Sequence, residues 1–64
     1  MDLKTRRLKK HLTQKQVSEA VNITESGYCL IENGQRNPSV ETAKAIAKVL
    51  GFNWTRFFEE EEKQ

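Results

Sequence analysis

Several features that define other classes of protein are scarce or missing in this chain of 64 residues. It has one cysteine, Cys29, so no intrachain disulfide can form. A lone thiol without a secretory apolar segment indicates a reducing, cytoplasmic environment. The apolar runs are only a few residues long, far short of the roughly 20 residues that a membrane-spanning helix needs. We therefore expect a cytoplasmic protein that does not enter a membrane.

Signals for β-strands and for catalytic chemistry are missing as well. The chain has no run of alternating β-branched residues and no tight turn between two such runs. It has no nucleophile–base pair, no carboxylate dyad and no glycine-rich phosphate loop, which argues against an enzyme. His11 has no second histidine or cysteine nearby, so we expect no metal site. The sequence thus predicts an all-α protein without a metal or cofactor.

The charge of the chain is small overall but unevenly distributed, with a net value of +2. Residues 1–36 carry seven Lys and Arg against four Asp and Glu, whereas residues 37–64 carry four against five. The first part therefore has a net charge of +3 and the second of −1. A basic amino-terminal half suits a polyanionic partner. A solvated helix face has the same pattern, so charge alone leaves both interpretations open.

Helix-start and helix-stop residues recur along the whole chain and predict five short helices. The helices are expected at about 3–10, 14–21, 25–32, 40–50 and 53–58. Their capping residues are Asp2, Thr13, Thr24, Ser39 and Asn53. Gln16 follows Thr13 at the spacing of a capping box. Asn33-Gly34 supplies left-handed residues that end the third helix, and Gly51 ends the fourth.

The apolar spacing gives most of these helices one inward face. Val17, Ala20 and Val21 share a face of the second helix, and Tyr28 and Ile31 face inward on the third. The fourth helix has the clearest apolar face, formed by Val40, Ala43, Ile46, Ala47 and Leu50. A domain of this size buries only about 60% of its unfolded surface, so it needs well-packed helices or a partner. The pattern predicts a compact all-α bundle.

The second and third helices, joined by a tight turn, have the spacing of a helix-turn-helix motif from Thr13 to Asn33. The sequence around them resembles the Xre family of helix-turn-helix regulators, which includes phage repressors and Cro proteins. The matching segments are Leu12-Thr-Gln14, Val17-Ser-Glu-Ala20, Ile31-Glu-Asn-Gly34, Asn37-Pro-Ser39 and Ile46-Ala-Lys-Val-Leu-Gly51. The resemblance implies a phage-repressor-like bundle of five helices and a bacterial or phage-infected host cell. We expect a DNA-binding domain at 1–58 and an acidic, flexible tail at 59–64.

The resemblance also implies which residues contact DNA, since the third helix of this family enters the major groove. The positions expected to read bases are Glu25, Ser26, Gly27, Cys29 and Leu30. The positions expected to contact phosphate are Thr13, Gln14, Asn33 and Arg36. Plainer interpretations stay open: Gln14 and Ser26 are also ordinary surface residues, and Cys29 is also a small packing residue.

Two structural roles are also expected, the first from the resemblance and the second from three aromatic rings within five residues near the end of the sequence. Arg7 and Glu32 occupy positions that form an ion pair in relatives, so we expect them to lock the first helix against the third. Trp54, Phe57 and Phe58 are expected in a homodimer interface, because two-fold operators require two-fold proteins. The same rings would also cap the core of a monomer. No effector domain is attached, so we expect no small-molecule effector.

Three residues of the third helix depart from the family pattern. Glu25 repels phosphate although it can accept a hydrogen bond from cytosine, and Gly27 weakens a helix. Leu30 suits a thymine methyl group or a protein-binding face. The leading hypothesis is a transcriptional regulator, a Cro-like repressor that binds double-stranded operator DNA as a homodimer. The alternative is a protein-interaction module of antitoxin or anti-repressor type, without tight DNA binding.

Overall fold

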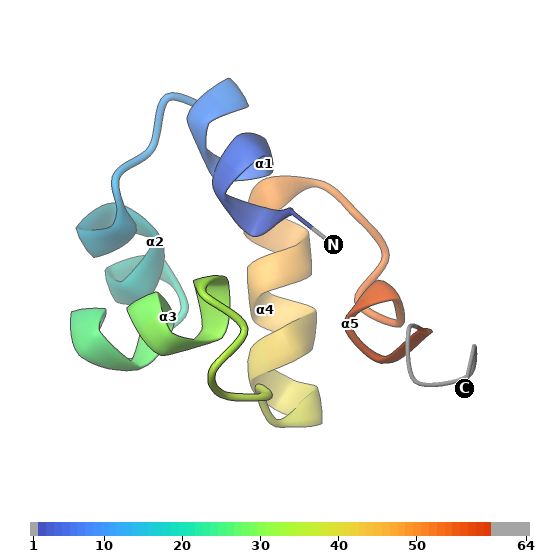
Figure 1. The fold of residues 1–64 in the computed structure, drawn as a ribbon. Helices are drawn as coiled ribbons and strands as arrows, with labels where there is room; N and C mark the ends of the chain where they lie inside the picture. The colour runs from blue at the N-terminus through green and yellow to red at the C-terminus, as the bar shows by residue number, and fades with distance from the viewer. Residues whose placement is uncertain (1, 60–64) are drawn as a thin grey trace.

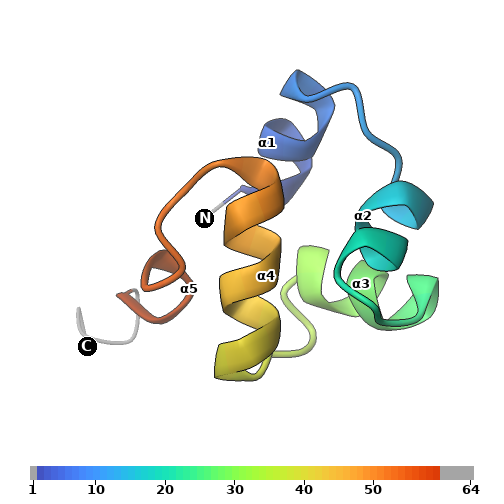
Figure 2. The ribbon, with the colours of Figure 1, turned by 180° about the vertical axis from the view of Figure 1, so that it is seen from behind.

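The computed structural model describes residues 2–59, and side chains up to residue 58, as a bundle of five helices. The helices are α1 (Leu3–Lys9), α2 (Gln14–Ala20), α3 (Glu25–Glu32), α4 (Val40–Leu50) and α5 (Arg56–Glu59). The longest helix, α4, runs through the middle of Figure 1, with α1 above it, α2 and α3 on one side and α5 on the other. Figure 2 shows the same arrangement from behind. Residues 2–59 contain no strand, so the all-α prediction is confirmed.

The first four helices begin at the capping residues that the sequence predicts. In each, a side-chain oxygen accepts a hydrogen bond from the backbone N–H three residues later, and the caps are Asp2, Thr13, Thr24 and Ser39. At Thr13 the bond is reciprocal, because the Thr13 N–H donates to Gln16 Oε1 at 2.9 Å. These bonds satisfy amides that have no partner within their helix, which fixes where each helix starts.

The same four helices each end before a residue with a left-handed backbone. The φ angles are 60° at His11, 64° at Asn22, 79° at Gly34 and 81° at Gly51. The residue after each of them donates its N–H to a carbonyl five residues earlier, at 2.9–3.2 Å. Asn33 stays in the right-handed region with φ −79°, so the prediction of a left-handed pair was wrong for Asn33 and right for Gly34.

The core lies between α4 and the other helices. Its buried apolar members are Leu3, Val17, Val21, Tyr28, Ile31, Ala43, Ile46, Ala47 and Leu50. Two predicted members are exposed, Ala20 and Val40. The first turn of α4, which begins with Val40, extends past the neighbouring helices in Figures 1 and 2. In α2, Ser18 is buried in place of Ala20, and its hydroxyl is satisfied by donating to the Lys15 carbonyl at 2.8 Å.

The fifth helix begins later than the sequence predicts. Asn53 Oδ1 accepts hydrogen bonds from the N–H and the hydroxyl of Thr55, at 3.0 and 2.9 Å. The Asn53 side chain therefore forms an Asx-turn with Thr55 and does not cap α5 directly. Trp54 lies in that turn, and the helix starts at Arg56. Residues 60–64, most of the predicted acidic tail, lie outside the described residues. No helix among the described residues is long and apolar enough to cross a membrane.

Candidate nucleic-acid interface

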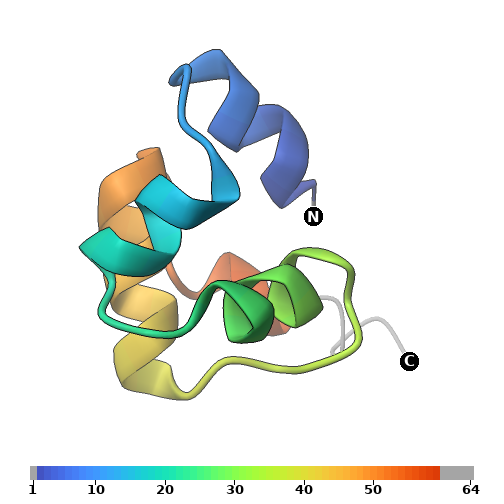
Figure 3. The same ribbon diagram turned by 90° about the vertical axis from the view of Figure 1, so that its left-hand side faces the viewer.

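The helices α2 and α3 lie side by side in front of α4, joined by a turn at residues 21–24 (Figure 3). Tyr28 and Ile31 hold α3 against the core. The opposite face of α3 presents Glu25 and Ser26, both exposed, and the half-buried Cys29 and Leu30. These are four of the five positions predicted to read bases. The structure therefore places them together on the outer face of the second helix of the motif.

The fifth position, Gly27, is buried on the flank of α3. Its N–H donates to Thr24 Oγ1 at 3.0 Å, so this backbone group is occupied by the helix cap. An ideal Cβ at this position would lie 3.4 Å from Nη1 of Arg36, which belongs to the loop after α3. Gly27 thus presents no group of its own to a ligand. It lies under the side chain of a residue predicted to contact phosphate.

Gln14 lies where the amino-terminal end of α2 meets the carboxyl-terminal end of α3. Its Nε2 donates to Glu32 Oε2 at 3.0 Å, across 18 positions of sequence. An amide nitrogen carries two N–H groups, so one remains for a ligand after this bond is made. Asn33, which follows Glu32, is exposed, and its Nδ2 lies 3.5 Å from Cys29 Sγ as a weak donor. The structure brings these two predicted phosphate contacts to the same end of the motif.

Arg7 and Glu32 form a bidentate ion pair beneath this end of the motif. Arg7 Nε donates to Glu32 Oε1 at 2.9 Å and Nη2 donates to Oε2 at 3.1 Å. Nη1 donates to the Leu12 carbonyl at 2.9 Å, which also ties down the α1–α2 connection. The two side chains are only 9% and 4% exposed. The pair therefore joins α1 to the last turn of α3, and Gln14 extends it to α2.

The titration of this cluster reflects the competition between burial and pairing. Burial favours the neutral acid at Glu32, but hydrogen bonds from Arg7 and Gln14 outweigh it and lower the pKa of this carboxyl below its ordinary value of 4.5. The hydrogen bond to Glu32 raises the pKa of Arg7. Burial, and then the nearby Glu32 charge, raises the pKa of the Tyr28 hydroxyl, which has no hydrogen-bond partner in the described structure. The pair is thus charged at neutral pH.

The aromatic residues near the end of the chain form a row of contacts beside α5. The ring centroids of Phe52 and Phe57 are 5.4 Å apart, those of Phe57 and Phe58 6.4 Å, and those of Trp54 and Phe58 6.1 Å. Phe52 and Phe57 pack against the core, whereas Trp54 and Phe58 do not belong to that cluster. Of the three rings predicted at a dimer interface, Phe57 thus has a role within one copy. Trp54 and Phe58 form a half-buried pair outside that core cluster.

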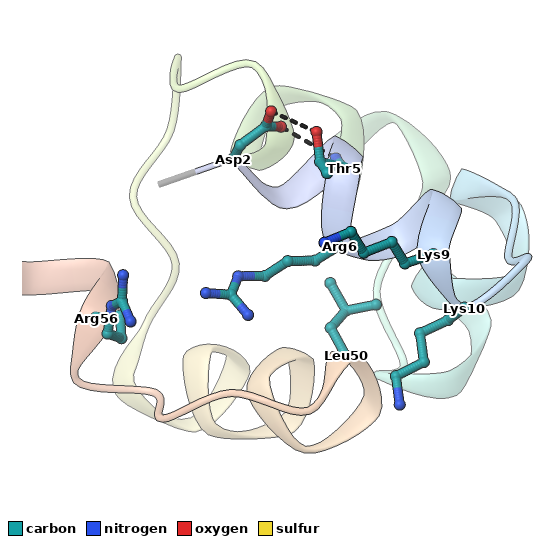
Figure 4. A pocket seen from close by; sticks show the side chains of 7 residues that line it. All are labelled: Asp2, Thr5, Arg6, Lys9, Lys10, Leu50 and Arg56. Carbon is teal, nitrogen blue, oxygen red and sulfur yellow. Dashed lines mark hydrogen bonds between the residues drawn. The ribbon is translucent and has the colours of Figure 1, made fainter.

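A basic cleft of about 360 Å³ lies away from the motif, between α1, the end of α4 and α5 (Figure 4). Its cationic lining residues are Arg6, Lys9, Lys10 and Arg56. Arg6 reaches into the cleft and stacks on the Phe52 ring at 4.8 Å. No lining residue belongs to α2 or α3. Part of the positive charge of the amino-terminal half, at Arg6, Lys9 and Lys10, therefore lies at this cleft and away from α2 and α3.

Comparison with known proteins decides the family. The family model described as helix-turn-helix matches residues 3–57. The chain belongs to the Xre-type helix-turn-helix family. The Xre-type protein is 50% identical over 58 residues to the uncharacterized HTH-type transcriptional regulator YqaF of Bacillus subtilis (strain 168). The aligned region covers 91% of this chain and 76% of the relative. The family consists of DNA-binding transcriptional regulators and is not a class of enzymes, which confirms the predicted class.

Two features of this Xre-type interface were not predicted from the sequence. One is the bond between Gln14 and Glu32, and the other is the position of Arg36 against Gly27. The first joins residues 18 positions apart, and the second joins α3 to the loop that follows it, so periodicity within one helix carries no signal for either contact. The glycine inside an otherwise regular helix is the one local feature that points to a close approach.

Proposed function

We propose that this Xre-type protein is a cytoplasmic, Cro-like repressor that binds operator DNA as a homodimer. The observation that carries the proposal is that α3 is fixed to the rest of the bundle at both of its ends. A threonine cap fixes its first turn, and the buried Arg7–Glu32 pair fixes its last turn. A helix held at both ends can present side chains to the major groove without a large loss of conformational entropy on binding.

Each exposed group has a chemical role in this proposal. Glu25 accepts a hydrogen bond from cytosine N4. The Ser26 hydroxyl forms a hydrogen bond with a donor or an acceptor on the edge of a base, and Leu30 contacts a thymine methyl group. The phosphate contacts are Thr13, the free N–H of the Gln14 amide, Asn33 and Arg36. These groups set the register of the protein on the duplex and supply most of the salt-dependent affinity.

The experiment that tests this function starts with selection of bound duplexes from a random pool. Affinity for the selected duplex and for a scrambled one is then measured over a series of salt concentrations. We expect log affinity to fall steeply with log salt, because each neutralised phosphate releases counterions. Glu25→Ala and Leu30→Ala should reduce the preference for the selected duplex by about 5- to 150-fold each, which corresponds to roughly 1–3 kcal/mol per base contact. Lys48→Ala, an exposed α4 residue, is the control.

A second candidate is a protein-interaction module of antitoxin or anti-repressor type. The observation that favours it is the composition of the outer face of α3, where Glu25 is acidic and Leu30 is apolar and half-buried. This function predicts no enrichment in the selection and no duplex binding at low salt. If Glu25→Ala and Leu30→Ala leave the ratio of the two affinities unchanged, α3 does not read bases through these side chains.

A further inference from the structure

The glycine inside the recognition helix has no conformational explanation. Gly27 is the third residue of α3, and its φ angle is not positive, so another residue would fit the backbone. Glycine also weakens a helix interior, because it loses the most backbone entropy on folding. We therefore look for the role of Gly27 in the atoms that surround the position of the missing side chain.

Two atoms border the space of the missing side chain, and the nearer one belongs to the helix cap. An ideal Cβ on Gly27 would lie 3.0 Å from Thr24 Oγ1 and 3.4 Å from Arg36 Nη1. A single methyl group would thus be in ordinary contact with the guanidinium, while a longer side chain directed toward Arg36 would compete with the guanidinium for the same volume. The chain after α3 turns back so that the Arg36 N–H donates to the Leu30 carbonyl at 3.2 Å. From that point the Arg36 side chain runs back along α3 to Gly27.

We propose that Gly27 is a positioning residue. Because it has no side chain, it leaves a space on the flank of α3, here called the seat, which the Arg36 guanidinium occupies. From this fixed place beside the recognition helix, Arg36 donates a hydrogen bond to a DNA phosphate. The proposal rests on the DNA-binding function proposed above. Among the described residues, the Arg36 side chain makes no hydrogen bond and no ion pair. Its N–H groups are therefore available for a ligand, and the seat restricts where they lie.

The flank that carries this guanidinium is distinct from the flank that carries Glu25. Successive residues of an α-helix are rotated by about 100°, which puts Gly27 and Leu30 near one another and Glu25 on the other side of the outer face. The recognition surface then has a cation on one flank and a carboxylate on the other. This charge distribution favours one orientation of α3 in the major groove, in which the Arg36 flank faces a phosphate backbone and the Glu25 flank faces away from it.

The test is a double-mutant cycle between Gly27 and Arg36 with duplex DNA. Gly27→Gln fills the seat, and Gly27→Ala is its matched control, because both variants place a Cβ against the Thr24 cap but only glutamine reaches the volume of the guanidinium. We expect Arg36→Ala to weaken binding about tenfold, as for the loss of a charged hydrogen bond. Gly27→Gln should cause a similar loss, and Gly27→Ala less than about a threefold loss.

The coupling between the two changes decides the proposal. In the Gly27→Gln background, Arg36→Ala should cost less than about twofold, because the guanidinium has already left its place. The slope of log affinity against log salt should fall by about one in either single variant and no further in the double variant. Losses that multiply to about a hundredfold would overturn the proposal. Should Gly27→Gln fail to fold, Gly27→Ser is used in the same cycle.

A readout without DNA separates this proposal from the proposed function. The side-chain Nε–H resonance of Arg36 should shift in free Gly27→Gln and stay close to its original position in Gly27→Ala and in Ser26→Ala. If the resonance behaves this way but no variant binds duplex DNA, the DNA-binding function fails while the seat exists. If DNA binds and the resonance is the same in all three variants, the seat is wrong and the function stands.

Discussion

Arg7 is a buried charge whose value to the fold depends on its partners. A guanidinium is costly to remove from water unless its N–H groups are bonded, and here Glu32 and the Leu12 carbonyl accept three of them. Replacing Arg7 leaves the Glu32 carboxylate buried without a charged partner, beside the neutral side chains of Gln14 and Tyr28. We expect Arg7→Leu to lower the free energy of unfolding at neutral pH by about 3–5 kcal/mol. Urea unfolding followed by circular dichroism measures this, and Lys9→Leu, an exposed change in the same helix, is the control.

The same pair predicts how stability depends on pH. The pKa of Glu32 is lower in the folded state than its ordinary value of 4.5, so the pair stabilises the protein fully above that pH. Its contribution is lost as the pH falls through the lowered pKa. The stability difference between wild type and Arg7→Leu should therefore shrink progressively in acid. A difference that stays constant down to acidic pH would mean that the Glu32 charge does not contribute through Arg7.

At the scale of helices and turns, the two positive φ angles outside glycine carry a measurable cost. Asn22 closes the turn between α2 and α3 with φ 64°, a region in which asparagine is tolerated but alanine is strained. We expect Asn22→Ala to destabilise the protein by about 1 kcal/mol and Asn22→Gly to be neutral or to stabilise it by up to about 1 kcal/mol. Thermal unfolding of both variants tests this, with Glu19→Ala as the control. Equal stability of the alanine and glycine variants would contradict it.

Helix boundaries were predictable where a short polar side chain bonds its own backbone. Thr13 and Gln16 form the capping box within four residues, so the signal is local and strong. Burial was less predictable, because it depends on what covers a position. Ser18 is buried, with its hydroxyl bonded to a local acceptor, and Ala20 is exposed, although hydropathy favours the opposite order.

The contacts of the site were predictable only where a family resemblance supplied them. The pairing of Arg7 with Glu32 spans 25 positions and came from the resemblance alone. The bond from Gln14 to the same carboxylate and the seat of Arg36 on Gly27 come from tertiary packing. No spacing rule within one helix or turn encodes a contact between a loop and the flank of another helix.

At the scale of the whole molecule, we expect different rings of the aromatic row to serve folding and the proposed dimerisation. Phe57 packs against the core, whereas Phe58 contacts Trp54 and Phe57 and does not belong to the core cluster. We expect Phe58→Ala to weaken dimerisation at micromolar concentration while it leaves the monomer folded. Phe57→Ala should instead destabilise the monomer by about 2–4 kcal/mol, through the loss of buried area. Sedimentation velocity and thermal unfolding distinguish the two effects.

The same sedimentation measurements also test the proposed homodimer itself. A wild-type protein that stays monomeric at micromolar concentration, with and without DNA, would refute the dimer. If Phe57→Ala weakens association and Phe58→Ala does not, the interface includes Phe57 and not Phe58. Association that is unchanged in both variants would move the interface away from these rings.

Trp54 is the sole tryptophan of the chain, and its placement gives the protein a built-in optical probe. The ring is half-buried, lies 5.1 Å from the Lys44 ammonium and contacts Phe58. Figure 1 shows α5, which follows Trp54, across α4 from α2. A change in its emission on adding operator duplex would report an event at the α5 end of the molecule.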